Sequence, residues 1–194
     1  RINVIAVDPN DSNIIYIGSP SGGLWKTLDE GANWTPLTDN QPVLGVSAIA
    51  INPNNTDVLY IGTGDKDSGD NYSIGVLKSL DGGNSWNTTG LDWTINQNRT
   101  IAKLIINSNN TDILYAATTS GLYRTTDAGV SWFKVLSGDI DDLEFKPGNP
   151  NVVYAIAPRK FYKSTDGGDT FVETTGVPTS GRAQIAVTDD HPYY

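Results

Sequence analysis

Closely spaced carboxylates in one glycine-containing stretch are the first candidates for chemistry in this sequence of 194 residues. In TGDKDSGDNY, the carboxylates are Asp65, Asp67 and Asp70, and Asn71 and Tyr72 follow directly. Such a group suits a hard cation such as Ca²⁺, which proteins bind through oxygen atoms. The match to an EF-hand calcium loop is imperfect. Two interpretations therefore stay open, a calcium site at these three Asp residues and a solvated acidic loop.

A second stretch, TTGLDWTINQNRTIAK, combines an aromatic ring with amide and guanidinium groups. Trp93, Asn96 and Arg99 suit a sugar, because an aromatic ring can cover its apolar face while polar groups bind its hydroxyls. In the alternative interpretation, Trp93 packs this loop onto its own repeat or the next one. The two stretches are long loops, and loop variation on a rigid scaffold is where function accumulates. The candidate ligand-binding residues are Asp65, Asp67, Asp70, Asn71, Tyr72, Trp93, Asn96 and Arg99.

A short box with an Asp and a Gly occurs four times, as KTLDEGANW, KSLDGGNSW, RTTDAGVSW and KSTDGGDTF. Every copy has a basic residue, a Ser or Thr, an Asp, a Gly and an aromatic residue at the same spacing. The box Asp residues are Asp29, Asp81, Asp127 and Asp166, and the aromatic residues are Trp34, Trp86, Trp132 and Phe171. Taken singly, each Asp could be a catalytic acid, a calcium ligand or part of a turn.

The recurrence of the box favours the turn. An Asp side chain accepts hydrogen bonds from the backbone N–H groups of the residues that follow it. The Ser or Thr two positions earlier can donate its hydroxyl to the carboxylate or bond the backbone, and Gly permits positive φ. We therefore predict that the four Asp residues are structural and that each aromatic residue packs against its sheet.

The elements that position these residues also repeat, as VIAVDPNDSNIIYIG, AIAINPNNTDVLYIG, KLIINSNNTDILYAA and DLEFKPGNPNVVYAI. In each segment, apolar residues alternate with others up to a polar turn, and a second apolar run with a Tyr follows. An alternation of period two indicates a β-strand. Each repeat predicts four short antiparallel strands, and repeats of roughly 40 to 55 residues with four strands predict a β-propeller.

We therefore expect an all-β protein, a β-propeller of four-stranded antiparallel blades. The expected blades cover about residues 1–44, 45–98, 99–138 and 139–180. The segment 181–194 resembles the first strand of a repeat, with Ile185 and Val187 at the apolar positions, so we expect it to begin a fifth blade. The sequence contains no Met. We expect it to be a fragment of a larger propeller protein, in which a signal could have preceded residue 1.

The box resembles the Asp-box, also called the BNR repeat, of sialidases, two-propeller xyloglucan hydrolases, the luminal domain of sortilin and a photosystem assembly factor. The resemblance rests on the four boxes and covers essentially the whole chain. It implies a propeller in which each box lies between the third and fourth strands of a blade, at the periphery. The segment IAVDPNDSNIIYIGSPSGGLWKTLDEGANW looks most like large secreted Asp-box proteins of Bacteroidetes, many of them exported by the type IX system. This similarity implies a secreted or cell-surface location.

The resemblance also gives two tests for catalysis. In the xyloglucan hydrolases, a catalytic Asp precedes a Gly-Gly pair in a loop of the first blade. In the corresponding stretch GSPSGG this position is Pro20, which cannot act as an acid. Sialidases carry an early Arg-Ile-Pro segment, whereas this chain has Arg1, Ile2 and Asn3. Both departures argue against these activities.

Composition excludes several other kinds of site. The absence of Cys excludes thiolate metal sites and Cys nucleophiles, and the single His, His191, excludes a multi-His metal site within this chain. A net charge of −9 disfavours nucleic acid and anionic membrane surfaces as partners. No apolar run approaches the length of a membrane span.

The first strands of the repeats hold a further group of polar residues. One register position is occupied by Val4, Ala48, Lys103, Asp142 and Gln184. These residues alternate with the apolar positions, so we expect them to line the central channel or to lie near its mouth. Asp141, Asp142 and Glu144 are the clustered acids of these strands and are the fallback candidates for chemistry.

We therefore predict a non-catalytic, secreted or cell-surface module that binds a glycan or a protein, within a larger exported bacterial protein. The expected partners are this ligand, other domains of the same polypeptide and the secretion machinery, without nucleic acid or membrane insertion. No cofactor is expected except calcium at the acidic loop. The alternative is a glycoside hydrolase of the Asp-box type whose catalytic acids lie mostly outside this fragment.

Overall fold

The fold consists of four antiparallel sheets of four strands each, in a computed structural model that describes residues 1–67, 71–175 and 183–188. Blade 1 comprises β1 (Val4–Val7), β2 (Ile15–Ser19), β3 (Gly23–Thr27) and β4 (Thr35–Pro36). Blade 2 comprises β5 (Val46–Ile51), β6 (Leu59–Thr63), β7 (Gly75–Ser79) and β8 (Asn87–Asp92). Blade 3 comprises β9 (Ile101–Ile106), β10 (Leu114–Thr118), β11 (Gly121–Thr125) and β12 (Phe133–Leu136). Blade 4 comprises β13 (Asp142–Lys146), β14 (Asn149–Ala157), β15 (Lys160–Ser164) and β16 (Val172–Thr174). The predicted four-stranded blades are confirmed.

Consecutive strands are neighbours in every sheet, and local turns make this possible. The turn after β5 begins at Asn52, whose side-chain oxygen accepts the N–H of Asn54 at 2.9 Å. Asp8 and Asn107 make the same bond after β1 and β9. Such Asx turns replace backbone pairing at the point where the chain reverses. The polar clusters of the sequence are therefore the hairpin turns of the blades.

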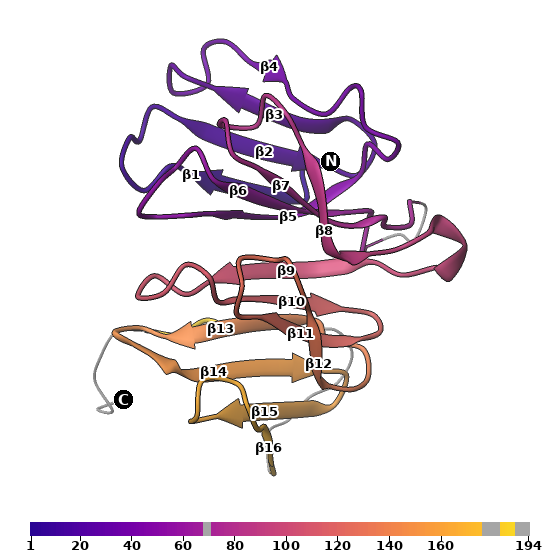
Figure 1. Cartoon of the computed structure of the whole chain (residues 1–194), viewed down its shortest axis with the longest axis vertical. Coiled ribbons are helices and arrows are strands. Elements are labelled where there is room, and N and C mark those ends of the chain that lie inside the picture. The colour runs from indigo at the N-terminus through magenta and orange to yellow at the C-terminus, as the bar shows by residue number, and fades with distance from the viewer. Residues whose placement is uncertain (68–70, 176–182, 189–194) are drawn as a thin grey trace.

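The four blades are stacked side by side in chain order, as Figure 1 shows. Their first strands lie next to one another, because β5 contacts both β1 and β9, and β9 contacts β13. One side of every blade therefore faces its neighbour, and the first strands together form the inner edge of the stack. This arrangement is a segment of a propeller around a central channel.

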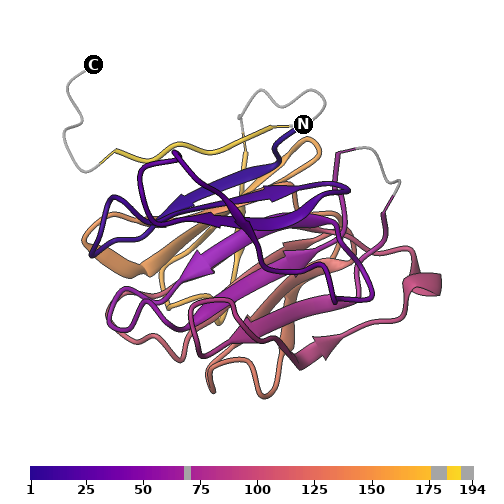
Figure 2. The ribbon, with the colours of Figure 1, turned by 90° about the horizontal axis from the view of Figure 1, so that it is seen from above.

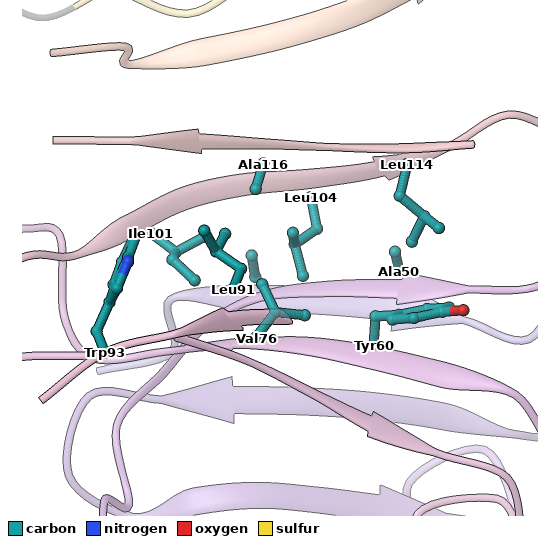
Figure 3. Packing of buried hydrophobic residues seen from close by; sticks show 10 residues of the cluster. Ala50, Tyr60, Val76, Leu91, Trp93, Ile101, Leu104, Leu114 and Ala116 are labelled. Atoms are coloured by element: carbon teal, nitrogen blue, oxygen red, sulfur yellow. The ribbon is translucent and has the colours of Figure 1, made fainter. Parts of the chain in front are cut away.

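Apolar side chains fill the three spaces between neighbouring blades. The cluster between blades 2 and 3 is drawn in Figure 3, where Ala50, Tyr60 and Val76 face Leu104 and Leu114. Equivalent clusters join blade 1 to blade 2 and blade 3 to blade 4. A four-stranded sheet is too small to bury its own apolar surface, so stacking supplies the hydrophobic stabilisation.

The segment 183–188 lies beside blade 4 but forms no strand. A hydrogen bond connects this segment to the blade: the N–H of Ile185 donates to the Asp142 carboxylate at 2.9 Å. In Figure 2 this segment, drawn in yellow, runs along the edge of the molecule at which β1 is seen. The expected first strand of a fifth blade covers residues 181–194, of which 181–182 and 189–194 lie outside the described residues. The described part, residues 183–188, is not paired with another strand and therefore has no ladder of backbone hydrogen bonds.

Helical structure is limited to one short 3₁₀ turn, η1 (Ile95–Gln97), within the described ranges. No helix in this part of the chain has the length and apolar character needed to cross a membrane.

Candidate functional site

The box of blade 2 shows how the four box carboxylates are used. Asp81, between β7 and β8, accepts the backbone N–H of Ser85 at 2.8 Å and the Ser85 hydroxyl at 2.6 Å. Ser79 donates its hydroxyl to Asp81 at 2.8 Å and accepts the N–H of Gly83 at 2.9 Å. Equivalent bonds surround Asp29, Asp127 and Asp166, except that the Asn33 amide takes the place of the hydroxyl at Asp29. Each of the four carboxylates is therefore held by hydrogen bonds within its own turn.

The aromatic residues of the boxes are partly buried next to these turns. Trp86 donates its indole N–H to the carbonyl of Leu37 in blade 1 at 3.1 Å. Trp34 and Trp132 instead donate to the carbonyl of their own box glycine, at 3.0 and 3.2 Å. Phe171 packs against the apolar cluster between blades 3 and 4. The aromatic residue thus connects the turn to the packed sheets.

The hydrogen bonds of the boxes make the stability of the protein sensitive to acid. The side-chain hydrogen bond from Asn33 lowers the pKa of Asp29 to about 2, and those from Ser85 and Ser131 do the same for Asp81 and Asp127. A pKa that is lower in the folded state means that the unfolded chain binds protons more readily. The stabilisation is therefore complete above about pH 4, and it is lost as the pH falls through about 2.

We expect the melting temperature to fall steeply between about pH 4 and pH 2, as measured by circular dichroism. An Asp81→Asn variant removes one of the titrating groups, so its melting temperature should depend less on pH over this interval. The same slope in wild type and variant would contradict the assignment of this acid sensitivity to the boxes.

Asp65 lies fully buried at the start of the loop between β6 and β7. Its carboxylate accepts hydrogen bonds from the Arg1 guanidinium at 2.5 Å, the Asn3 amide at 3.3 Å and the N–H of Asp67 at 3.0 Å. The N–H of Asp65 donates to the carbonyl of Asn71 at 2.7 Å. Asp65 therefore ties the long loop of blade 2 to the N-terminal segment.

A cavity of about 340 Å³ opens among the first strands of the four blades. The register residues predicted to face the channel all line it: Val4, Ala48, Lys103, Asp142 and Gln184. Lys103 binds Glu144 at 2.6 Å and Asp142 at 3.3 Å. Burial by itself lowers the pKa of Lys103, but the hydrogen bond to Glu144 and the Asp142 charge outweigh it and raise this pKa. The ammonium group is therefore firmly charged.

Lys66 makes a second group of ion pairs at this cavity. Its ammonium contacts the carboxylate of Asp139 and lies 3.4 Å from that of Asp141. Asp141 is buried, and its second carboxylate oxygen has no hydrogen-bond partner among the described residues. The fallback acids Asp141, Asp142 and Glu144 thus each lie within ion-pair distance of a lysine ammonium group.

A separate groove of about 570 Å³ lies where the long loops of blade 2 meet the loops of blade 1. It is lined by Ser21, Pro42, Val43, Leu44, Asn71, Tyr72 and Ile95. Three of its side chains are large, apolar and exposed: Leu44 at 38%, Tyr72 at 39% and Ile95 at 53%. Asn71 donates its amide to the carbonyl of Pro20 at 2.6 Å, which fixes one wall of the groove against blade 1.

Trp93 lies between blades 2 and 3, with only 7% of its surface exposed. Its ring meets Tyr123 edge-on at 6.1 Å, and the Arg99 guanidinium lies 5.3 Å from the ring centre. This packing favours the interpretation that Trp93 fixes its loop to the neighbouring blade. Asn96 is exposed within η1, next to the groove residue Ile95.

The candidate residues of the acidic loop therefore lie at two different places in the structure. Asp65 and Asp67 line the channel cavity, whereas Asn71 and Tyr72 line the groove. Asp70 and His191 lie outside the described residues. The described ranges contain no group of three Asp, Glu, His or Cys side chains that could hold a metal ion. Calcium binding by Asp65, Asp67 and Asp70 stays a prediction.

Of the three exposed apolar side chains of the groove, Tyr72 was among the candidates predicted from the sequence, whereas Leu44 and Ile95 were not. Leu44 and Ile95 come from the connections that lead into blades 2 and 3. An apolar residue inside a long polar loop is the signal that could have identified Ile95, since such a side chain has no blade position to occupy. Leu44 gives no comparable signal, because only Gly45 separates it from the buried strand β5.

The fold and the four boxes define the class of this protein as an Asp-box-like β-propeller fragment. The chain is similar to a xyloglucanase of Paenibacillus sp, with 29% identity in an alignment of 145 residues that covers 69% of this chain and 14% of the xyloglucanase. The structure of an ancestral GH74 enzyme superimposes with a TM-score of 0.76 at 23% identity, over 91% of this chain and 24% of that one. No protein-family profile matches the chain.

The protein YCF48, in a complex with a D1 peptide, has a similar fold. It matches with a TM-score of 0.63 at 18% identity, over 91% of this chain and 54% of YCF48. At these identities, the solved structures establish the fold alone. The chain spans about a quarter of the GH74 enzyme and about half of YCF48, so it corresponds to part of a larger propeller.

Proposed function

We propose that this chain is part of a non-catalytic binding propeller that holds a segment of a protein partner in the groove beside blade 2. The observation that carries this proposal is the collection of Leu44, Tyr72 and Ile95 in one groove next to the amide of Asn71. Exposed apolar groups beside a few fixed polar ones are typical of ligand sites. Two of the three apolar side chains are aliphatic, which favours an apolar peptide side chain over a sugar ring.

The surroundings of the channel acids support a binding role over hydrolysis. Glycoside hydrolysis needs two carboxylates that flank the scissile bond, one of them able to deliver a proton. Asp142 and Glu144 are paired with Lys103, and Asp141 lies beside Lys66. The position of the xyloglucan-hydrolase acid in blade 1 is occupied by Pro20. A glycoside hydrolase whose acids lie in other parts of a longer protein is the alternative.

Replacement of Tyr72 by Ala should weaken ligand binding about tenfold or more, because aromatic side chains at the centre of a site carry much of its binding energy. The protein is first screened on a tiled peptide array and a glycan array, and the dissociation constants of the ligands found are measured for both forms. Phe133→Ala is the matched control, because Phe133 is an aromatic residue that is 63% exposed on β12, away from the groove.

Three outcomes would contradict the proposal. Binding that Tyr72→Ala and Phe133→Ala weaken equally would exclude the groove. Binding that depends on Tyr72 and is seen only on the glycan array would mean that the ligand of the groove is a sugar and not a peptide. Release of reducing sugar from a polysaccharide by the wild-type protein would favour the hydrolase.

We also propose the secreted or cell-surface location that the Asp-box resemblance implies. Export by the type IX system, a glycan ligand and contacts with other domains of the same polypeptide stay predictions.

A further inference from the structure

The same kind of hydrogen bond occurs at each of the three interfaces between blades. A Tyr in the second strand of one blade donates its hydroxyl to the carbonyl that follows the box Asp of the next blade. Tyr16 donates to Gly82 at 3.4 Å, Tyr60 donates to Ala128 at 3.1 Å, and Tyr115 donates to Gly167. Burial raises the pKa of each of these tyrosines to about 12, so each hydroxyl keeps the proton that it donates.

A basic residue in the third strand accompanies each Tyr. Lys26 donates to the carbonyl of Gly82 at 3.2 Å, and Lys78 donates to that of Ala128 at 3.0 Å. Both ammonium groups lie 5.2 Å from the centre of the Tyr ring beside them. At the third interface, Arg124 lies 5.9 Å from the Tyr115 ring and pairs with Asp169 of the next box. Each interface thus has a Tyr and a basic residue that together bind the box turn of the following blade.

Blade 4 carries the same pair, Tyr154 and Lys163. They are directly opposite each other on β14 and β15, as Tyr60 and Lys78 are on β6 and β7. Tyr154 is half-buried and stacks on Phe161, while Lys163 is exposed. Within the described part of the chain, no box carbonyl lies against this pair. Blade 4 therefore presents one half of an interface that occurs complete three times in the same molecule.

The inner edge of blade 4 is already occupied by this chain. Ile185 donates its N–H to Asp142 on β13 at 2.9 Å. Gln184 lines the channel cavity together with Val4, Ala48 and Lys103 of the first strands. The segment 183–188 therefore lies where the first strand of a fifth blade belongs. Blade 1 of a second copy would need the same space for its β1, which argues against a head-to-tail dimer.

We propose that the face of blade 4 that carries Tyr154 and Lys163 binds the box turn of a fifth blade whose first strand includes residues 183–188. The main-chain carbonyl after the box Asp of that blade accepts hydrogen bonds from the Tyr154 hydroxyl and the Lys163 ammonium. The partner is thus three further strands with an Asp-Gly turn between the last two. Tyr154 and Lys163 would recognise a main-chain carbonyl in a turn of fixed geometry. This recognition does not depend on the type of residue that supplies the carbonyl.

The test is an extended chain that contains a fifth box. Residues 1–189 are followed by residues 109–136, which continue the repeat in register and carry the second, third and fourth strands of blade 3 with their box. Tyr154→Phe and Lys163→Ala are each expected to lower the melting temperature of the extended chain by about 2–4 °C. The same substitutions should leave the melting temperature of the 194-residue chain unchanged. Tyr60→Phe, at a complete interface, is the control and should lower the melting temperature of both chains.

Two further measurements make each outcome decisive. Amide hydrogen exchange should show protection of the added strands, and sedimentation velocity should show a monomer for the 194-residue chain. Added strands that remain unprotected would overturn the proposal, as would an extended chain whose melting temperature is insensitive to Tyr154→Phe. A dimer of the 194-residue chain that Tyr154→Phe dissociates would assign the face to a second copy instead.

Discussion

The Gly75→Ala variant is expected to lose about 3 kcal/mol or more of its free energy of unfolding, because two penalties coincide at this position. The φ of Gly75 is +101°, in a region that side chains other than glycine rarely adopt. A Cβ at this position would lie 1.9 Å from the carbonyl oxygen of Leu91 on β8. That oxygen belongs to the backbone of the neighbouring strand, so β7 and β8 would have to separate.

The loss should extend to the loop that precedes β7. Gly75 donates its N–H to the Ser73 hydroxyl at 2.8 Å and accepts the Thr63 hydroxyl at 2.8 Å. These buried bonds hold the end of the loop that carries Asn71 and Tyr72. A shift of the Gly75 backbone would therefore disturb the groove as well as the sheet.

Urea denaturation measures this effect, with Gly138→Ala as the matched variant. Gly138 has nearly the same φ, +104°, but nothing lies within 4 Å of the position that a Cβ would take. It should therefore show only the backbone penalty, about 1–2 kcal/mol. Equal losses in the two variants would mean that the contact with Leu91 is relieved at no cost.

Leu143→Ala is expected to lower the free energy of unfolding by about 2–5 kcal/mol, the range seen when a fully buried Leu is truncated. Leu143 on β13 has no exposed surface and packs with Tyr115 and Ala155 in the cluster between blades 3 and 4. The cavity left by truncation would lie between two sheets whose backbones are fixed by their own ladders. The surroundings therefore have little freedom to close it.

Ile5→Ala is the control for this prediction, because Ile5 takes the same register position in blade 1. Its side chain is 64% exposed, while its counterparts are 9% exposed at Ile49 and 4% at Leu104. Truncation at Ile5 should change the free energy of unfolding by less than about 0.5 kcal/mol. A large loss at Ile5 in urea denaturation would mean that another surface covers blade 1 in solution.

The repeated features of this fold could be predicted from the sequence because each of them is a local pattern that recurs from blade to blade. The alternation in β5, the Asx turn at Asn52 and the box around Asp81 each depend on residues close together in the chain. Their recurrence in register made a propeller the consistent interpretation. Lys103 and Asp142 line the cavity among the first strands, and their common position in the sequence alternation places them together, because alternation fixes the face to which each strand residue points.

The features that occur once were harder to predict, since they depend on contacts between loops of different blades. No local pattern relates Asn71 to the carbonyl of Pro20, or Lys66 to Asp139 in the connection before blade 4. The burial of Trp93 depends on Tyr123 of the next blade. In residues 183–188 the strand pattern is present, but a strand also needs a partner with which to pair.

The contact between each Tyr and the following box gives the stack a direction. Tyr60 of blade 2 binds the turn of blade 3, while the turn of blade 2 is bound by Tyr16 of blade 1. Such a stack behaves as a one-dimensional array of nearest neighbours, in which the total stability is a sum of blade terms and interface terms. The inner blades contribute to two interfaces and the outer ones to a single interface within the described chain. We therefore expect unfolding to begin at the terminal blades, and each blade added to the array to stabilise the one before it.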